Sequence, residues 1–387
     1  DETFRDNVAI SEDFSFFFSS SKEQFTGRPV AEFVKWIAFS AVGNSPPACH
    51  LIVVAFHTLA SLLLALLFRR LGLNLELAYL GGVLFLVDVS HFHSLHHISA
   101  IDYPLGLVFG VLGVLSYLRY SATSDSLWMV ATYAALIAAV ATHLAMVMAW
   151  PLLLYLAWLR FGSRAWHLHL PLGTVLTLLS AYLLSITPGD TTTGVSISYY
   201  TTEGIPAAFA SFCRMMAWFT SRLFTTAHWL PMPLYEVQPW EFYLGALTLA
   251  AIAVLTWHRH AILAVWGGWL VVFLMPFALI SEKMSIGAME GASHYLYLAS
   301  AGSSLILAWT LQQIGLWLRS RLKLWGVSMY GAATLVLLCS SYVALKRVEA
   351  FSYYNSGRYL ISRDVDTAVE YLALALEHGQ EVLELHE

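Results

Sequence analysis

The segment VLFLVDVSHFHSLHHISAIDYPLGLVFG, residues 83–110, places several ionisable side chains between two strongly apolar runs. These side chains are His91, His93, His96 and His97, with Asp88 and Asp102 at the edges. Imidazoles and carboxylates in such apolar surroundings require water or polar partners nearby. Three interpretations follow: a solvated turn with interfacial histidines, a metal site, or part of a catalytic cleft.

The metal interpretation rests on the types of side chain, because histidine and carboxylate suit divalent cations. The candidate ligands are His91, His93, His96 and Asp102, with Asp88 as an alternative carboxylate. Their spacing matches no standard zinc pattern. The sequence therefore assigns no firm cofactor and leaves a divalent metal as an alternative.

Other candidate site residues lie far from this segment along the chain. Asp1 and Glu2 are adjacent acids that precede a predicted interfacial helix, and His143 interrupts a long apolar run. With His93, these three are the candidate catalytic residues. Further candidate binding residues are Arg28, His91, Arg214, Arg222, Glu290, His294 and Tyr295.

The composition indicates what kind of elements must position these residues. Hydrophobic residues make up 58% of the 387 and charged residues 12%, whereas soluble domains carry about a quarter charged residues. Such a chain cannot cover itself with polar surface, so we predict an all-α, polytopic membrane helix bundle. The net charge of −5 gives no indication of a nucleic-acid partner.

Ten segments are apolar and long enough to be predicted as membrane spans, which need about 20 residues each. They are residues 47–70, 75–91, 102–119, 126–142, 144–160, 166–187, 240–257, 261–281, 293–318 and 324–346. The apolar run from Leu127 to Leu159 is too long for one span, and we divide it at His143.

Alternating these spans across a bilayer separates the positive charges, which collect in cytoplasmic loops. One face receives Arg69, Arg70, Arg119, Arg160, Arg164, Arg259, Arg319, Arg321 and Lys323. On the other face, only Lys346 and Arg347 lie at the end of a predicted span. The histidine-rich segment, His143 and the loops that carry the other candidate residues then share the outer face. We therefore expect an integral protein of a bacterial cytoplasmic or ER-type membrane, with its functional face in the periplasm or lumen.

This topology divides the chain into five regions. They are an outer loop with an amphipathic helix (1–46), a six-span core (47–187), a long outer loop with a second amphipathic helix (188–239), a four-span region (240–348) and an outer tail (349–387). The tail has small and aromatic residues at helix–turn–helix positions that resemble one tetratricopeptide unit. The polar start at Asp1 leads us to expect an apolar segment before it.

Several of these motifs, in this order, resemble GT-C-type glycosyltransferases that use lipid-phosphate sugars. The similarity is greatest to the transmembrane-and-tetratricopeptide O-mannosyltransferase group, followed by the protein O-mannosyltransferases, and it covers nearly the whole chain. Asp1-Glu2 matches an acidic pair in the first outer loop. GRPVAEFVKWIAFSAVGNSPPACHLIVVAFH resembles an arginine–proline helix that precedes a histidine-bearing span, here with His50 and His57. HYLYLASAG, from His294, is similar to an arginine–tyrosine–leucine–tyrosine–leucine–proline signature.

Histidine replaces other residues at three places in this resemblance. His93 and His143 stand where the family usually has acids, and His294 stands where it has arginine. Ile101 replaces a second arginine, and Ala299 replaces proline. These replacements indicate either a modified active site or a degenerate one.

The resemblance implies a hexosyltransferase whose donor is a polyprenyl- or dolichyl-phosphate sugar and whose acceptor is a protein or glycan hydroxyl. Asp1 or Glu2 would act as the general base. Arg28, Arg214, Arg222 and a protonated His294 would bind the leaving phosphate. The alternative is a catalytically inactive scaffold subunit of GT-C type, which holds protein partners through the outer loop and the repeat tail.

Overall fold

The structure is a computed structural model that describes most of the helical part of the chain. The described residues are 27–43, 45–91, 94–95, 98–161, 164–186, 204–224, 239–257, 261–279, 293–322, 342, 353, 356–357, 360–361 and 364–377. Within them the chain forms twelve α-helices and no strands. The prediction of an all-α protein is confirmed for this part of the chain.

The helices of the described residues follow one another along the chain. The α-helices are α3 (Pro29–Val42), α4 (Pro46–Arg70), α5 (Leu75–Leu86), α7 (Asp102–Thr123), α8 (Ser126–Thr142), α9 (Ala149–Phe161), α10 (Arg164–Ile186), α12 (Ile205–Phe224), α13 (Pro239–Trp257), α14 (Ala261–Ala278), α16 (Ser300–Leu322) and α18 (Val365–Glu377). Short 3-10 helices join some of them: η2 (Val89–His91), η3 (Ile98–Ile101), η4 (Leu144–Met148) and η6 (Ser293–Leu296).

Three of the described helices are long and apolar enough to cross a membrane, and these lie in α4, α7 and α13. The prediction of ten spans is therefore wrong for the described residues. Several predicted spans form shorter helices, such as α5 with 12 residues and α8 with 17. Helix α16 has 23 residues, but its serines, glutamines and arginines reduce its apolar character. The predicted span 324–346 lies outside the described residues except for Tyr342.

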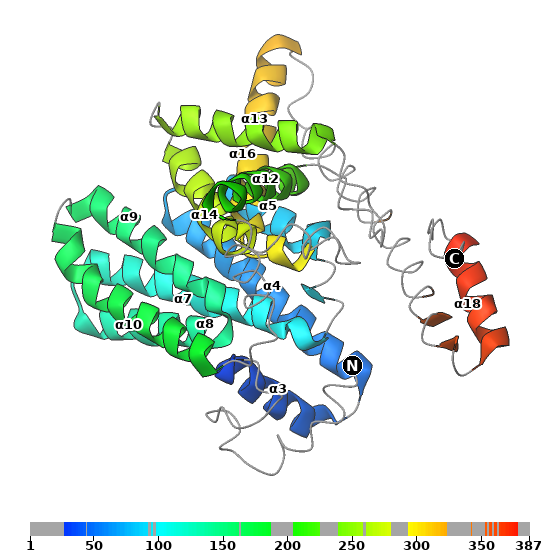
Figure 1. Ribbon diagram of the computed structural model, residues 1–387. Coiled ribbons are helices and arrows are strands. Elements are labelled where there is room, and N and C mark those ends of the chain that lie inside the picture. Colours follow the sequence, from blue (N-terminus) through cyan, green and yellow to red (C-terminus); the bar gives the residue numbers. More distant parts are fainter. Residues whose placement is uncertain are drawn as a thin grey trace.

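The described helices from α3 to α16 pack into one bundle, shown in Figure 1. Helix α7 packs against α8 and α4, α9 and α10 pack against each other, and α16 packs against α5 and α14. Helix α3 lies across α8 and α4 at one edge of the bundle. Large buried side chains, including Trp266, Trp269 and Phe273, fill the interior between the helices.

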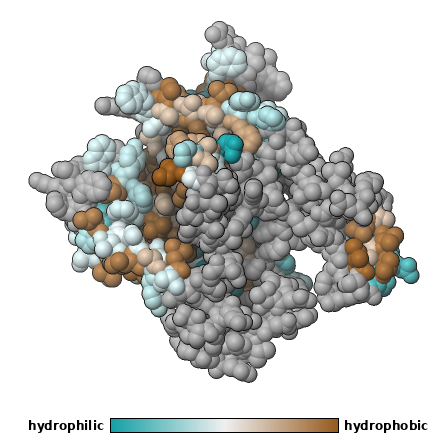
Figure 2. All heavy atoms as spheres, in the orientation of Figure 1, coloured by the Kyte–Doolittle hydropathy of each residue, from teal (hydrophilic) through white to brown (hydrophobic). Residues whose placement is uncertain are grey.

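Large apolar side chains also lie on the outside of the bundle. Leu51 and Leu62 of α4 are 69% and 62% exposed, and Leu247 of α13 is 68% exposed. Figure 2 shows hydrophobic side chains gathered at the surface of the described part. Exposed apolar surface of this kind is expected where lipid surrounds the protein, so the three candidate spans indicate association with a membrane.

In the described part of the tail, residues Val365–Glu377 form helix α18, whose N-terminus is capped by Asp364. The Asp364 carboxylate accepts hydrogen bonds from the Thr367 hydroxyl at 2.7 Å and its amide at 3.2 Å. A Cβ atom added to Gly357 would lie 2.7 Å from Leu372 Cγ, so the segment before α18 approaches it closely. The tetratricopeptide assignment of this tail stays a prediction.

Candidate functional site

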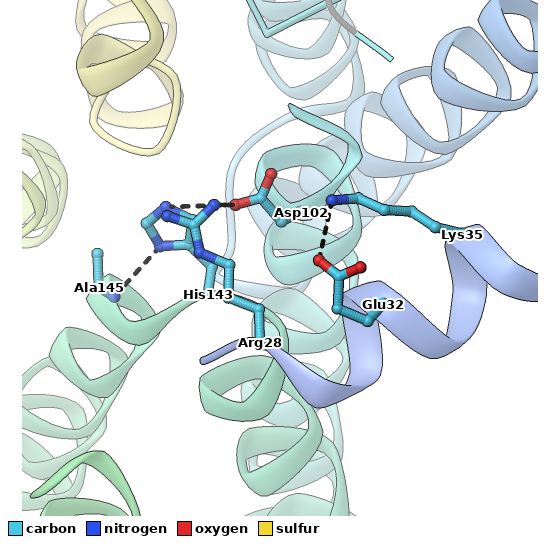
Figure 3. Close-up of polar contacts among 6 residues, drawn as sticks. All are labelled: Arg28, Glu32, Lys35, Asp102, His143 and Ala145. Carbon is cyan, nitrogen blue, oxygen red and sulfur yellow. Dashed lines mark hydrogen bonds and ion pairs between the residues drawn. The ribbon is translucent and has the colours of Figure 1, made fainter. Parts of the chain in front are cut away.

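An ion pair between two elements distant in the chain forms the centre of the candidate site. Arg28 precedes α3 and Asp102 is the first residue of α7, and the Arg28 Nη1 atom donates to Asp102 Oδ2 (Figure 3). The Asp102 side chain is fully buried, whereas 36% of the Arg28 side chain is exposed. The ion pair therefore joins a buried carboxylate to a guanidinium side chain that is partly exposed at the surface.

His143 completes this cluster because the chain leaves the helical conformation there. Its backbone is extended, with φ −151° and ψ 119°, and it separates α8 from η4. The His143 Nδ1 atom accepts a hydrogen bond from the Ala145 amide at 3.2 Å. The His143 Nε2 atom lies 3.8 Å from Asp102 Oδ2, beyond hydrogen-bond distance (Figure 3).

The electrostatic state of the cluster follows from burial and from the Arg28 charge. Burial holds the pKa of His143 well below its ordinary value, and the nearby Arg28 cation lowers this pKa further. For Arg28, burial lowers the pKa, but the attraction of Asp102 outweighs it and the net pKa is raised. At neutral pH the site therefore holds a charged guanidinium and a neutral imidazole.

Two polar atoms of this cluster are left without hydrogen bonds. Asp102 Oδ1 and His143 Nε2 are both buried, and neither has a hydrogen-bond partner in the described part of the chain. Most buried polar atoms in proteins are paired. This pair of atoms is therefore the feature of the site that points most directly to ligand binding.

Helix α3 turns its charged residues toward the bundle. Glu32 and Lys35 are 4% and 6% exposed, and Lys35 Nζ donates to Glu32 Oε1 at 3.2 Å (Figure 3). Phe33 and Ile37 lie on the outer side, 37% and 47% exposed. An apolar outer face and a charged inner face suit a helix that lies at a membrane surface.

Aromatic rings surround the cluster on the side of α14 and η6. The Tyr103 ring lies 4.4 Å from that of His143 and 5.8 Å from that of His294. The Tyr295 ring stacks on Phe277, with centroids 5.0 Å apart. The predicted residues Arg28, His143, His294 and Tyr295 thus meet at one end of the bundle.

A second polar network holds η6 and α16 in this position. His57 Nδ1 and the Tyr297 hydroxyl are 2.8 Å apart, and His57 Nε2 lies 3.0 Å from the Leu86 carbonyl oxygen. His91 Nε2 is 2.6 Å from the Ser300 hydroxyl. The sequence did not predict a role for Tyr297 or Ser300, although both lie within the quoted HYLYLASAG signature.

The structure does not place the remaining predicted site residues in this cluster. Arg222 of α12 is 2% exposed and its Nε atom lies 3.0 Å from Glu241 Oε1, so it is held in a buried ion pair. Arg214 lies on an exposed position of α12. Their predicted contacts with a phosphate stay predictions. Five predicted site residues lie outside the described residues: Asp1, Glu2, His93, His96 and Glu290.

The described residues contain no group of three or more His, Cys, Asp or Glu side chains placed to hold a metal ion. Of the proposed ligands, His91 bonds to Ser300 and Asp102 pairs with Arg28. Asp88 Oδ1 accepts the Ser90 amide at 2.9 Å at the start of η2. A site that includes His93 and His96 stays a prediction.

Comparison of the chain with models of protein families, with curated proteins and with solved structures gives no match. The resemblance to GT-C-type glycosyltransferases therefore stays a prediction.

Proposed function

We propose that the chain is a membrane glycosyltransferase of GT-C type, which moves a sugar from a polyprenyl- or dolichyl-phosphate donor to a protein or glycan hydroxyl. The observation that carries the proposal is the convergence of Arg28, Asp102 and His143 from three different elements. They meet next to His294 and Tyr295, which the sequence resemblance had placed in the same site. A random scatter of polar residues in an apolar bundle does not predict this meeting.

Arg28 suits the binding of the donor phosphate. A guanidinium carries five N–H donors and remains charged at all physiological pH values. One donor is directed to Asp102, and the exposed part of the side chain leaves others for a ligand. Charge that develops on a leaving phosphate is stabilised by such a fixed cation.

The aromatic side chains beside Arg28 suit the sugar. Ligand sites combine apolar and aromatic walls with a few polar groups that fix orientation. Tyr103, Tyr295 and Phe277 supply such a wall next to the ion pair. His294, which lies against Tyr295 with ring centroids 3.9 Å apart, is in place to contact the same ligand.

The orientation of the helices supports an outer-face site. Helix α7 begins at Asp102 and carries Arg119 toward its other end, and α4 ends with Arg69 and Arg70. Positive residues mark the cytoplasmic end of a span. We therefore propose that the cluster faces the periplasm or lumen, where lipid-phosphate sugars are accessible from the bilayer.

One observation favours the alternative of an inactive scaffold subunit. Asp102 is fully buried and ion-paired, so the Arg28–Asp102 contact also serves to fasten α3 to α7. A protein that only positions partner subunits has use for this contact without any chemistry.

A transfer assay separates the two functions. The full chain in lipid nanodiscs is incubated with radiolabelled polyprenyl- and dolichyl-phosphate sugars and a Ser/Thr-rich peptide, with and without EDTA. We expect Arg28→Gln to reduce transfer by about 10²–10³-fold, the usual effect of losing one charge-stabilising group. Arg70→Gln changes an exposed arginine at the opposite end of α4 and serves as the matched control.

Two outcomes together would contradict the proposed enzyme and support the scaffold: the wild-type chain turns over no donor, and other subunits co-purify stably with it. Loss of activity in EDTA would support the metal alternative.

A further inference from the structure

The unpaired atoms of Asp102 and His143 differ in hydrogen-bonding character. His143 Nδ1 accepts the Ala145 amide proton, so its lone pair is occupied and this nitrogen carries no hydrogen. The neutral imidazole must then carry its hydrogen on Nε2, which makes Nε2 a donor. Asp102 Oδ1 is a carboxylate oxygen and accepts only. The cluster thus has one unpaired donor on His143 and one unpaired acceptor on Asp102, whose Oδ2 atom lies 3.8 Å from His143 Nε2.

A hydroxyl group is the simplest ligand that satisfies both atoms. Its oxygen accepts from His143 Nε2 while its hydrogen is donated to Asp102 Oδ1. We propose that Asp102 and His143 together bind the acceptor hydroxyl, and that Asp102 is the base that deprotonates it. This inference rests on the proposed function for the transfer step, and it replaces Asp1 or Glu2 as the general base.

The step conserves charge and atoms. The hydroxyl oxygen forms a bond to the anomeric carbon of the donor sugar, and its proton passes to Asp102 Oδ1. The bond between the anomeric carbon and the phosphate oxygen breaks, and its electron pair leaves with the lipid phosphate. Protonated Asp102 no longer neutralises Arg28, so the guanidinium becomes available to balance the charge on the leaving phosphate.

Two other buried histidines, His57 and His169, lack this arrangement. His57 has partners for both ring nitrogens, Tyr297 and the Leu86 carbonyl. His169 in α10 has neither ring nitrogen hydrogen-bonded within the described part, and its ring packs on Tyr117 with centroids 4.8 Å apart. No carboxylate of the described residues forms an ion pair with His169, so a hydroxyl there would find no acceptor.

Transfer kinetics in the nanodisc assay test the chemical role. Asp102→Asn keeps a side chain of the same shape but cannot take the proton, and we expect kcat to fall by about 10²–10⁴-fold with little change in the KM of the donor. His143→Phe removes the Nε2 donor and is expected to lower the rate, whereas His143→Gln retains an amide donor and should restore most of it. Far-UV circular dichroism and unfolding temperature identify any variant that fails to fold.

The source of the hydroxyl is decided by the products. Transfer of label to the peptide identifies a substrate hydroxyl, and release of free sugar in the absence of peptide identifies water. If Asp102→Asn retains full activity while Asp1→Asn or Glu2→Gln abolishes it, the inference is wrong and the proposed function stands.

Binding without turnover gives an independent test. N-acetyl-serine amide, but not N-acetyl-alanine amide, is expected to raise the unfolding temperature of the full chain, and His143→Phe should abolish the difference. A cryo-EM map with resolved waters should show an oxygen between Asp102 Oδ1 and His143 Nε2. If the wild-type chain uses no donor, the proposed function fails, and these two measurements alone decide the hydroxyl site. If both are also negative, the inference is overturned.

Discussion

At the scale of single residues, Asp102 determines how the site behaves. Its burial makes the Arg28 partner necessary, because an uncompensated buried charge is far more costly than a paired one. The same burial leaves Oδ1 available only to a ligand that enters the cluster. A single carboxylate therefore links the attachment of α3 to the proposed chemistry.

The Arg28–Asp102 ion pair should make a single substitution more destabilising than the double substitution that removes both charges. Arg28→Met leaves the buried carboxylate unpaired, and we expect a loss of about 2 kcal/mol, below the usual 3–5 kcal/mol because Arg28 is partly exposed. Arg28→Met/Asp102→Leu should recover part of this loss, since both charges are then absent. Unfolding of the chain in mixed micelles measures both values, with Arg70→Met as the control. If the double variant loses as much stability as Arg28→Met, or more, the two residues do not interact in the way that the ion pair requires.

His143 should make stability dependent on pH. The folded chain holds the pKa of His143 well below 6.5, whereas the unfolded chain binds a proton near that value. This contribution to stability is complete above pH 6.5 and is lost as the pH falls, by at most about 1.4 kcal/mol per pH unit. We expect the unfolding temperature of the wild-type chain to fall more between pH 7.5 and 5.5 than that of His143→Gln. Parallel decreases in the two proteins would exclude His143 as the titrating group.

At the scale of helices, close backbone approaches set the positions of the elements around the site. Helices α12 and α13 cross where Gly245 meets the backbone of α12. Their buried Arg222–Glu241 pair reinforces the same contact. Because Phe219 of α12 lies 6.2 Å from the Tyr295 ring, a shift of α12 would disturb the aromatic wall.

Two glycine substitutions test this crossing. A Cβ atom at Gly245 would lie 1.7 Å from the Ala217 carbonyl oxygen, whereas a Cβ atom at Gly268 of α14 meets nothing within 4 Å. We expect Gly245→Ala to destabilise the chain by more than about 2 kcal/mol through overpacking. Gly268→Ala should be neutral or stabilising by up to about 1 kcal/mol, because alanine favours helix. Similar unfolding temperatures for the two variants would contradict the close crossing.

At the scale of the whole molecule, the bundle brings the ionisable residues to one end and leaves arginines at the other. Arg28, Asp102 and His143 meet where α7 begins and α8 ends, while Arg69, Arg70 and Arg119 lie toward the opposite helix ends. This polarity matches the expected distribution of positive charge across a membrane.

Cysteine accessibility tests the orientation. Cys213 is exposed and must be replaced first, together with Cys49 and Cys339. Ser40→Cys on α3 and Ser126→Cys at the start of α8 then mark the two ends of the bundle, since both serines are exposed. In right-side-out vesicles we expect an impermeant maleimide to label the first, and the second only after permeabilisation. Labelling of both from the same side would contradict an outer-face site.

The sequence by itself determined the helical class, the membrane-like composition and most candidate residues. Apolar runs and their breaks are local features, so the helix at residues 29–42 and the interruption at His143 were predictable from the chain. The number of membrane spans was not predictable from the sequence. The length and hydropathy of a segment do not show where 3-10 turns and polar faces shorten a helix.

Only the tertiary structure decided which of these residues meet. The sequence indicates Asp102 as a candidate metal ligand, whereas in the structure its partner is Arg28, 74 positions earlier. The assignment of the His143 hydrogen to Nε2 likewise depends on the Ala145 amide, whose direction the turn sets. Long-range pairing arises from the packing of helices against one another, which no local pattern of residues encodes.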